Sequence, residues 1–307
     1  MERAELRLAV LIDADNAPRS AIKDVMAEVA VHGTPTIKRI YGDWTSPNMS
    51  TWKPLLLENA ISPVQQYAYT TGKNATDSAM IIDAMDILYS GRVDGFVLVS
   101  SDSDFTRLAT RLREAGMTVY GMGERKTPAP FIVACDKFIY IEVIRAAGEK
   151  ARAAARAAEQ RLEKEKAEKA RLEREKKEKA EAAAKAEAGK AEKTAESRKA
   201  SETKPAKRTA KKQAKPAEPE VESGVPMTVV ELLADSVESV ADEDGYALMG
   251  DVGNLLVKKQ PDFDPRNFGF SKLSQLFKSL ERFELDIRPT NLPHVKQMYV
   301  RDKEEKS

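Results

Sequence analysis

A chain of 307 residues is longer than one ordinary domain, so its length predicts two domains. The single cysteine, Cys135, excludes an internal disulfide and a zinc site built from several cysteines. No run of about 18 apolar residues is present to cross a bilayer, and the first apolar run is too short for a signal peptide, so we expect a cytoplasmic protein with no membrane partner.

The charges are divided unequally along a chain whose formal net charge is only +1. Residues 1–149 contain 16 Lys and Arg against 19 Asp and Glu, and residues 221–307 contain 11 against 16. Residues 150–220 reverse the balance, with 23 basic against 14 acidic residues. Such a basic block is an electrostatic footprint for a polyanion such as nucleic acid, although a solubilising linker has the same composition.

Short apolar runs and amphipathic segments alternate over the first 145 residues. The predicted strands are residues 6–12, 36–42, 61–67, 96–100, 117–121 and 138–141, and the predicted helices are residues 18–30, 52–59, 77–89 and 105–115. Strictly alternating elements of this kind predict a parallel sheet with helices on both faces, which is the α/β class.

Residues 146–225 separate this predicted domain, residues 1–145, from a second one. Between residues 146 and 196 the sequence is almost entirely Ala, Glu, Lys and Arg, and Leu162 and Leu172 are its only large aliphatic residues. Many Glu–Lys pairs without an apolar seam predict a lone charged helix rather than a coiled coil. The proline-interrupted lysines of residues 204–219 are predicted to be disordered.

The second predicted domain covers residues 226–301. Helices are expected at residues 229–240, 248–257 and 272–281, and a strand pair at residues 284–288 and 297–301. Three helices followed by a β-ribbon form the plan of a winged helix, a small α+β domain whose third helix usually meets nucleic acid. The expected exposed residues for that contact are Arg266, Lys272 and Lys278.

Acidic residues follow two predicted strands of the first domain and begin its middle helix. Because the carboxyl ends of parallel strands meet at one edge of a sheet, we expect these groups to converge in one acidic cleft. The candidate groups are Asp13, Asp15, Asn16, Asp77, Asp102 and Asp104. Each acid taken alone is explained as a helix cap or a turn residue, but their convergence favours a functional site.

Clustered carboxylates repel one another unless a cation or a raised pKa neutralises them. Mg²⁺ or Mn²⁺ binds carboxylate oxygens and water and also bridges phosphate oxygens, so the cluster predicts metal-dependent phosphodiester hydrolysis. Neither histidine joins the cluster, because His32 follows the first predicted helix and His294 lies in the second domain. This distribution argues against a histidine-based ribonuclease mechanism.

The first 145 residues resemble the NYN family, which belongs to the PIN-like nucleases. The matching segments are LIDADN (11–16), YGDW (41–44), GKNATDSAMIIDAM (72–85), VLVSSDSDF (97–105) and GMTVYGMG (116–123). The resemblance implies a metal-binding site formed by Asp13, Asn16, Asp77, Asp102 and Asp104. Asn74 and Ser101 stand where glycine is frequent in the family, and neither difference removes an acid.

Residues 226–301 resemble the OST-HTH family, also called LOTUS. The resemblance rests on DGYALMGDVGNLL, on PDFDPRNFGFSKLSQLF and on the ending FEL…YVR. It implies that this domain binds RNA or a protein partner.

These observations predict a ribonuclease that depends on Mg²⁺ or Mn²⁺. Asp13, Asp77, Asp102 and Asp104 are the expected metal ligands, directly or through water. Asn16 is expected to orient a ligand or the scissile phosphate, and Lys73 to contact phosphate.

Two other functions remain open from the sequence. The segment LIDADNA is also similar to the start of haloacid-dehalogenase phosphatases, in which the first Asp is a covalent nucleophile, although Ala17 replaces the expected Thr or Val. Alternatively, the acids bind a metal without turnover in an RNA-binding adaptor protein.

Overall fold

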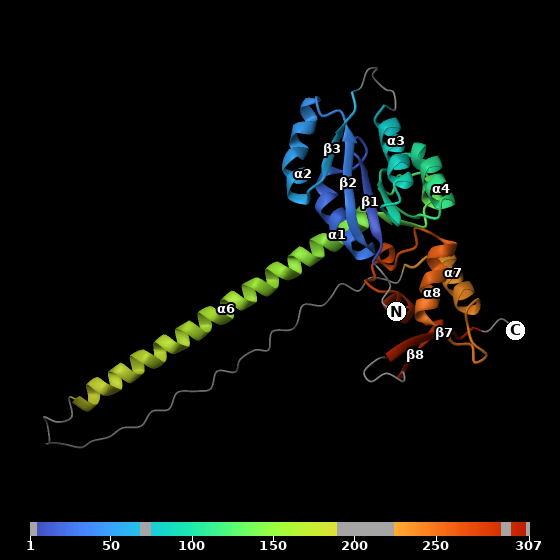
Figure 1. The fold of residues 1–307 in the computed structure, drawn as a ribbon. Helices are drawn as coiled ribbons and strands as arrows, with labels where there is room; N and C mark the ends of the chain where they lie inside the picture. Colours follow the sequence, from blue (N-terminus) through green and yellow to red (C-terminus); the bar gives the residue numbers. More distant parts are fainter. Residues whose placement is uncertain (1–4, 68–74, 189–223, 290–295, 305–307) are drawn as a thin grey trace, which may run out of the picture. The chain divides into compact units, whose positions relative to one another are not determined.

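The computed structural model describes residues 5–67, 75–188, 224–289 and 296–304 (Figure 1). The described residues up to Gly148 and those from Gly224 on belong to one compact unit, and the residues from Glu149 belong to a second. Within the described ranges, no helix combines the length and the apolar character needed to cross a membrane.

In the described residues up to Gly148, six strands form a parallel sheet in the order β3-β2-β1-β4-β5-β6 (Figure 1). The strands are β1 (Arg7–Asp13), β2 (Thr34–Gly42), β3 (Ser62–Gln65), β4 (Gly95–Val99), β5 (Thr118–Gly123) and β6 (Lys137–Tyr140). The central strands β1 and β4 are buried from Leu8 to Asp13 and from Gly95 to Val99, which explains their unbroken apolar runs. The predicted α/β class is confirmed.

Helices cover both faces of this sheet (Figure 1). They are α1 (Ile22–His32), α2 (Lys53–Asn59), α3 (Ala75–Tyr89), α4 (Thr106–Glu114) and α5 (Ala129–Ala134). One buried cluster joins α1 and α2 to the sheet through Val25 and Leu56, and a second joins α3, α4 and α5 through Met80, Leu108 and Phe131. The sequence did not predict α5, because its six residues are too few to display a helical period.

The strand β5 approaches its neighbours closely at Gly123. A Cβ atom added there would lie 2.6 Å from the carbonyl oxygen of Ser100 and 2.9 Å from the ring of Phe138. Only glycine fits between these two groups without displacing one of them.

The helix α6 (Ile141–Ala188) begins immediately after β6. Ile141 and Ile144 in its first turn are buried against the sheet, whereas every side chain from Glu149 to Lys166 is exposed. The charged helix expected from the sequence is therefore present in the described residues, and it starts before the predicted boundary at residue 146.

The described residues from Gly224 on form a small α+β domain. Its elements are α7 (Met227–Glu238), β7 (Ala247–Leu248), α8 (Met249–Lys259), α9 (Leu273–Lys278), β8 (Phe283–Pro289) and β9 (Lys296–Asp302). The strands form an antiparallel sheet in the order β7-β9-β8, and Leu233, Leu256, Phe277 and Val300 belong to the core. The predicted helices and β-ribbon are confirmed, whereas β7 is too short to be recognised in a sequence.

Candidate metal centre at the carboxyl edge of the sheet

Asp13 is the last residue of β1 and is only 1% exposed. Its Oδ1 accepts hydrogen bonds from the backbone N–H groups of Asp15 (2.9 Å) and Asn16 (3.3 Å). Its Oδ2 accepts from Asn16 Nδ2 (2.8 Å) and from the Ser100 hydroxyl (2.8 Å). A carboxylate has about four lone-pair sites, so both oxygens of Asp13 are already well supplied with donors.

Ser100 connects this buried carboxylate to the end of β4. Its hydroxyl donates to Asp13 and accepts a hydrogen bond from the backbone N–H of Asp102 (3.1 Å). Asp102 Oδ1 in turn accepts from the backbone N–H of Asp104 (2.9 Å), so Asp102 caps the single 3₁₀ turn Ser103–Phe105. The loop after β4 is thus fixed by a chain of hydrogen bonds that starts at Asp13.

Three carboxylates converge next to this loop. Asp77 comes from the first turn of α3, Asp102 follows β4, and Asp104 lies in the 3₁₀ turn. Each offers one oxygen, and the three oxygens lie within 4.8 Å of one another. Asp77 and Asp102 are partly buried and Asp104 is exposed. Carboxylate oxygens at this spacing suit a hard divalent cation.

The electrostatics of the cluster also favour a cation. Burial raises the pKa of Asp77 to about 6, and the negative charges of Asp13, Asp102, Asp104 and Asp15 add to this effect. Burial and the charge of Asp13 also raise the pKa of Asp15. Since a bound cation would relieve this repulsion, the donor set and its charge fit Mg²⁺ or Mn²⁺.

The structure thus divides the predicted site residues into two groups. Asp77, Asp102 and Asp104 lie together, while Asp13 and Asn16 are hydrogen-bonded to each other. The sequence reasoning missed Ser100, which connects the two groups. The only sequence signal for Ser100 was its position, directly after an apolar run and two residues before Asp102.

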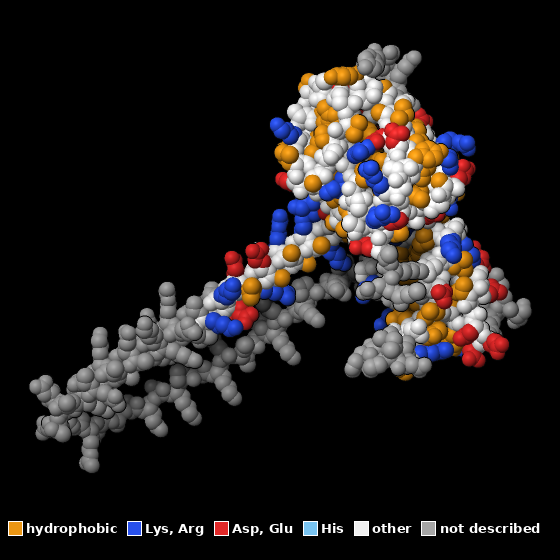
Figure 2. All heavy atoms as spheres, in the orientation of Figure 1, with side chains coloured by type: hydrophobic (Ala, Val, Ile, Leu, Met, Phe, Trp, Pro, Cys, Tyr) orange, Lys and Arg blue, Asp and Glu red, His pale blue; other side chains and the backbone are white. Residues whose placement is uncertain are grey.

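The predicted nucleic-acid contacts differ from one another in their surroundings. Lys73 lies outside the described residues. Lys272 immediately precedes α9, Lys278 ends it, and both are exposed. On the face drawn in Figure 2, basic and acidic side chains are interspersed.

Arg266 is not the exposed side chain that the sequence predicts. It is 24% exposed and forms ion pairs of 2.7 Å with both Glu28 and Asp264. Glu28 lies on α1, 238 residues earlier in the chain, so the sequence around Arg266 does not predict this ion pair. The assignment of Arg266 to RNA therefore competes with these contacts.

Comparison with protein families identifies an NYN domain at residues 7–142 and an OST-HTH/LOTUS domain at residues 223–295. Both matches confirm the families that the sequence motifs resemble. A search of curated proteins finds no match.

Solved structures that resemble the chain include three bacterial proteins. One is a protein of unknown function from Vibrio parahaemolyticus, with 20% identity and a TM-score of 0.40, and the match covers 46% of this chain and 96% of that one. The second is an uncharacterised protein from Nitrosomonas europaea, with 31% identity, a TM-score of 0.25 and coverage of 33% and 94%. The third is from Chromobacterium violaceum, with 27% identity, a TM-score of 0.22 and coverage of 28% and 89%.

Proposed function

From a chain that combines an NYN domain at residues 7–142 with an OST-HTH/LOTUS domain at residues 223–295, we infer a metal-dependent nuclease that hydrolyses phosphodiester bonds of RNA. NYN domains are typically nucleases, and OST-HTH/LOTUS domains bind RNA. The observation that carries the proposal is the convergence of Asp77, Asp102 and Asp104 at the carboxyl edge of the sheet, where open α/β sheets bind their ligands.

In this proposal Asp77, Asp102 and Asp104 hold Mg²⁺ or Mn²⁺. When bound to these residues, such an ion would supply Lewis-acid stabilisation of negative charge on the phosphate and would activate water. The protein supplies rigidity, because Asp77 belongs to a helix and Asp102 is fixed by the hydrogen bonds that it makes with Ser100 and Asp104.

Asp13 has a supporting part in the same proposal. Its oxygens already accept four hydrogen bonds, so a contact of Asp13 with the ion through water is more favourable than a direct one. Its bond to Asn16 Nδ2 fixes the orientation of the Asn16 amide, which then orients the scissile phosphate. A buried negative charge behind the three ligands also increases the attraction for a cation.

The C-terminal domain would select and hold the substrate. Exposed lysines such as Lys272 and Lys278 contact phosphates without reading sequence, and we assign them to capture rather than to chemistry. Lys73 precedes α3, the helix that carries Asp77 in its first turn, and we propose that Lys73 contacts phosphate. The division of labour follows the predicted domains, residues 1–145 for cleavage and residues 226–301 for binding.

The test is cleavage of a labelled single-stranded RNA by the wild type and by Asp102→Asn, each with Mg²⁺, with Mn²⁺ and with EDTA. Asparagine is also a good helix cap, so this variant removes the charge with little effect on the loop. Asp86→Asn is the matched control, because Asp86 is an exposed acid on the same helix as Asp77 but outside the cluster. A single-stranded DNA of the same sequence tests the preference for RNA.

We expect metal-dependent cleavage that Asp102→Asn loses and Asp86→Asn retains. If the folded wild type binds the RNA but cuts it under none of these conditions, the chain is an RNA-binding adaptor. Trapping of a phosphate ester on Asp13 would instead support the phosphatase alternative.

A further inference from the structure

The strand β6 is an edge of the six-stranded sheet, and an edge strand presents unpaired backbone groups. The backbone N–H of Phe138 on β6 donates a hydrogen bond of 2.9 Å to the carbonyl oxygen of Pro261. Two residues further along β6, the hydroxyl of Tyr140 donates to Asp262 Oδ2 at 2.7 Å. The loop of the C-terminal domain that begins at Pro261 therefore satisfies groups on this edge of the N-terminal domain.

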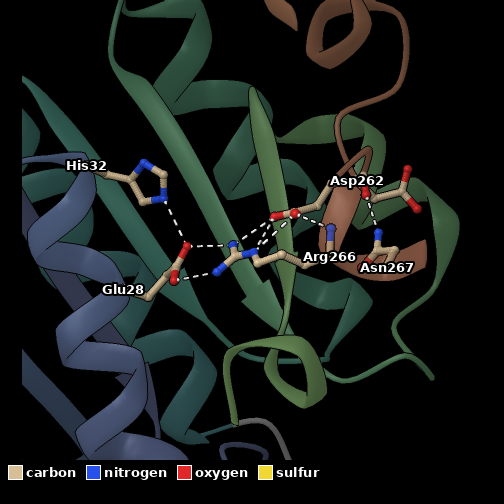
Figure 3. Close-up of polar contacts among 6 residues, drawn as sticks. Glu28, His32, Asp262, Arg266 and Asn267 are labelled. Carbon is tan, nitrogen blue, oxygen red and sulfur yellow. Dashed lines mark hydrogen bonds and ion pairs between the residues drawn. The ribbon is translucent and has the colours of Figure 1, made fainter. Parts of the chain in front are cut away.

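Arg266 supplies the strongest contact of the same loop (Figure 3). Its Nη1 and Nη2 donate to the two carboxylate oxygens of Glu28 on α1, at 2.9 and 2.7 Å. Its Nε and Nη2 donate to Asp264 Oδ2, at 3.0 and 2.7 Å. A planar guanidinium that engages two carboxylates in this way is a geometry that lysine cannot reproduce.

The surroundings of Glu28 show that this contact is largely shielded from water. The side chain of Glu28 is 12% exposed, and His32 Nε2 lies 3.6 Å from its Oε1. Burial alone would raise the pKa of Glu28, but its interactions with His32 and Arg266 outweigh this effect and bring the pKa to about 2. A carboxylate in this position depends on its cationic partner, because a shielded charge without a partner is strongly unfavourable.

We propose that residues 261–266 are a docking element by which the C-terminal domain binds α1 and β6 of its own chain, with Arg266 as the anchor. The partner is the same chain because the linker keeps the two domains at a high effective concentration. Docking occupies the guanidinium of Arg266, so RNA is bound by other residues of the domain. None of the docking residues belongs to the acidic edge, and the inference does not depend on nuclease activity.

The experiment uses the full chain with two spin labels, at Glu58→Cys on α2 and at Asp251→Cys on α8, both of which are exposed positions. Cys135 is buried and does not compete for labelling. Double electron–electron resonance then measures the distribution of distances between the labels. We expect one narrow distribution for the otherwise wild-type protein and a several-fold broader one for Arg266→Gln.

Two further variants make the result specific. Glu28→Gln removes the other half of the ion pair from the other domain, and we expect the same broadening. Arg288→Gln is the matched control, because Arg288 pairs with Asp286 within the C-terminal domain, and we expect no broadening. Circular dichroism identifies a variant that does not fold. If one of Arg266→Gln and Glu28→Gln does not fold, the distance distribution of the other one tests the proposal.

Three results would overturn the proposal. The first is a broad distribution in the wild type, and the second is a narrow one in both Arg266→Gln and Glu28→Gln. The third is a dimer detected by light scattering, in which the measured distance between the labels disappears when labelled chain is diluted with unlabelled chain. Docking would then take place between two copies of the chain. If Arg266→Gln loses RNA affinity tenfold while its distribution of label distances stays narrow, Arg266 binds RNA and is not a docking anchor.

Discussion

The acidic edge and the Arg266 contact both contain several carboxylates, but they differ in their electrostatic surroundings. At the Arg266 contact, the guanidinium of Arg266 is paired with Glu28, and the pKa of Glu28 is about 2. At the acidic edge, Asp77 is surrounded by other carboxylates, and its pKa is about 6. A guanidinium of the chain neutralises Glu28, whereas like charges oppose one another at the acidic edge, which is an arrangement that a cation would stabilise. This difference separates a structural contact from a binding site more clearly than the number of acids does.

The largest expected effect is the loss of metal binding when one acid of the edge is neutralised. Asp77→Asn removes one of three converging ligands, and we expect RNA cleavage to fall by about 10³-fold, a magnitude typical of removing one key electrostatic contact. Mn²⁺ binding measured by calorimetry should weaken in parallel. Asp86→Asn on the same helix is the control, and equal effects of both variants would refute a local site.

The next largest effect concerns the neutralised cluster. Arg266→Ala leaves Glu28 largely buried without its main partner, and we expect it to destabilise the fold by about 2–3 kcal/mol, below the cost for a fully buried pair. Glu28→Gln in the Arg266→Ala background should recover part of this loss, because it removes the unpaired charge. Urea unfolding of the single and double variants measures both quantities, and strictly additive effects would contradict the coupling.

A smaller effect of opposite sign is expected at the acidic edge when no metal is present. The pKa of Asp77 is raised from 3.8 to about 6, so its charge opposes folding fully above pH 6 and not at all below pH 3.8. In EDTA, Asp77→Asn should therefore stabilise the protein above pH 6 by about 1 kcal/mol, after a reduction for solvent screening. The gain should disappear as the pH falls to 3.8. Thermal unfolding of both proteins at several pH values tests this, and a loss of stability at pH 7 would contradict it.

The smallest effect is expected at the exposed lysines of the C-terminal domain. Lys272→Ala and Lys278→Ala should each weaken RNA binding a few-fold and reduce the salt dependence by about one charge. The cleavage rate at saturating RNA should stay unchanged. Fluorescence anisotropy at several salt concentrations measures the affinity, and no change in either variant would move the RNA surface elsewhere.

The sequence predicted the acidic edge because its cause is local. Apolar runs that are followed closely by Asp13 and Asp102 identify two buried strands, and parallel strands bring their carboxyl ends together. The hydrogen bond that Asp13 accepts from Ser100 could not be predicted, since the two residues are 87 positions apart in the chain. The sequence pattern predicted the same role for Asp13 and Asp77, but their surroundings differ, because Asp13 is buried and accepts four hydrogen bonds whereas Asp77 is partly buried beside Asp102 and Asp104.

The exposure predicted for Arg266 was wrong for a related reason. Its segment contains two prolines and no apolar period, which are features of an exposed loop. Its partner Glu28 belongs to another domain, and contacts between domains follow no short-range pattern in a sequence. The short elements α5 and β7 were missed because a few residues cannot display a period.

Gly123 places the two clusters under a common constraint. On one side Gly123 lies against the carbonyl oxygen of Ser100, the residue whose hydroxyl connects Asp13 to Asp102. On the other side it lies against the ring of Phe138, whose backbone N–H donates a hydrogen bond to Pro261. A larger residue at this position would displace one of these groups or both. In evolutionary terms, the acidic edge and the β6 edge cannot change independently at this residue, so a lineage that loses this glycine should show compensating changes at one edge or both.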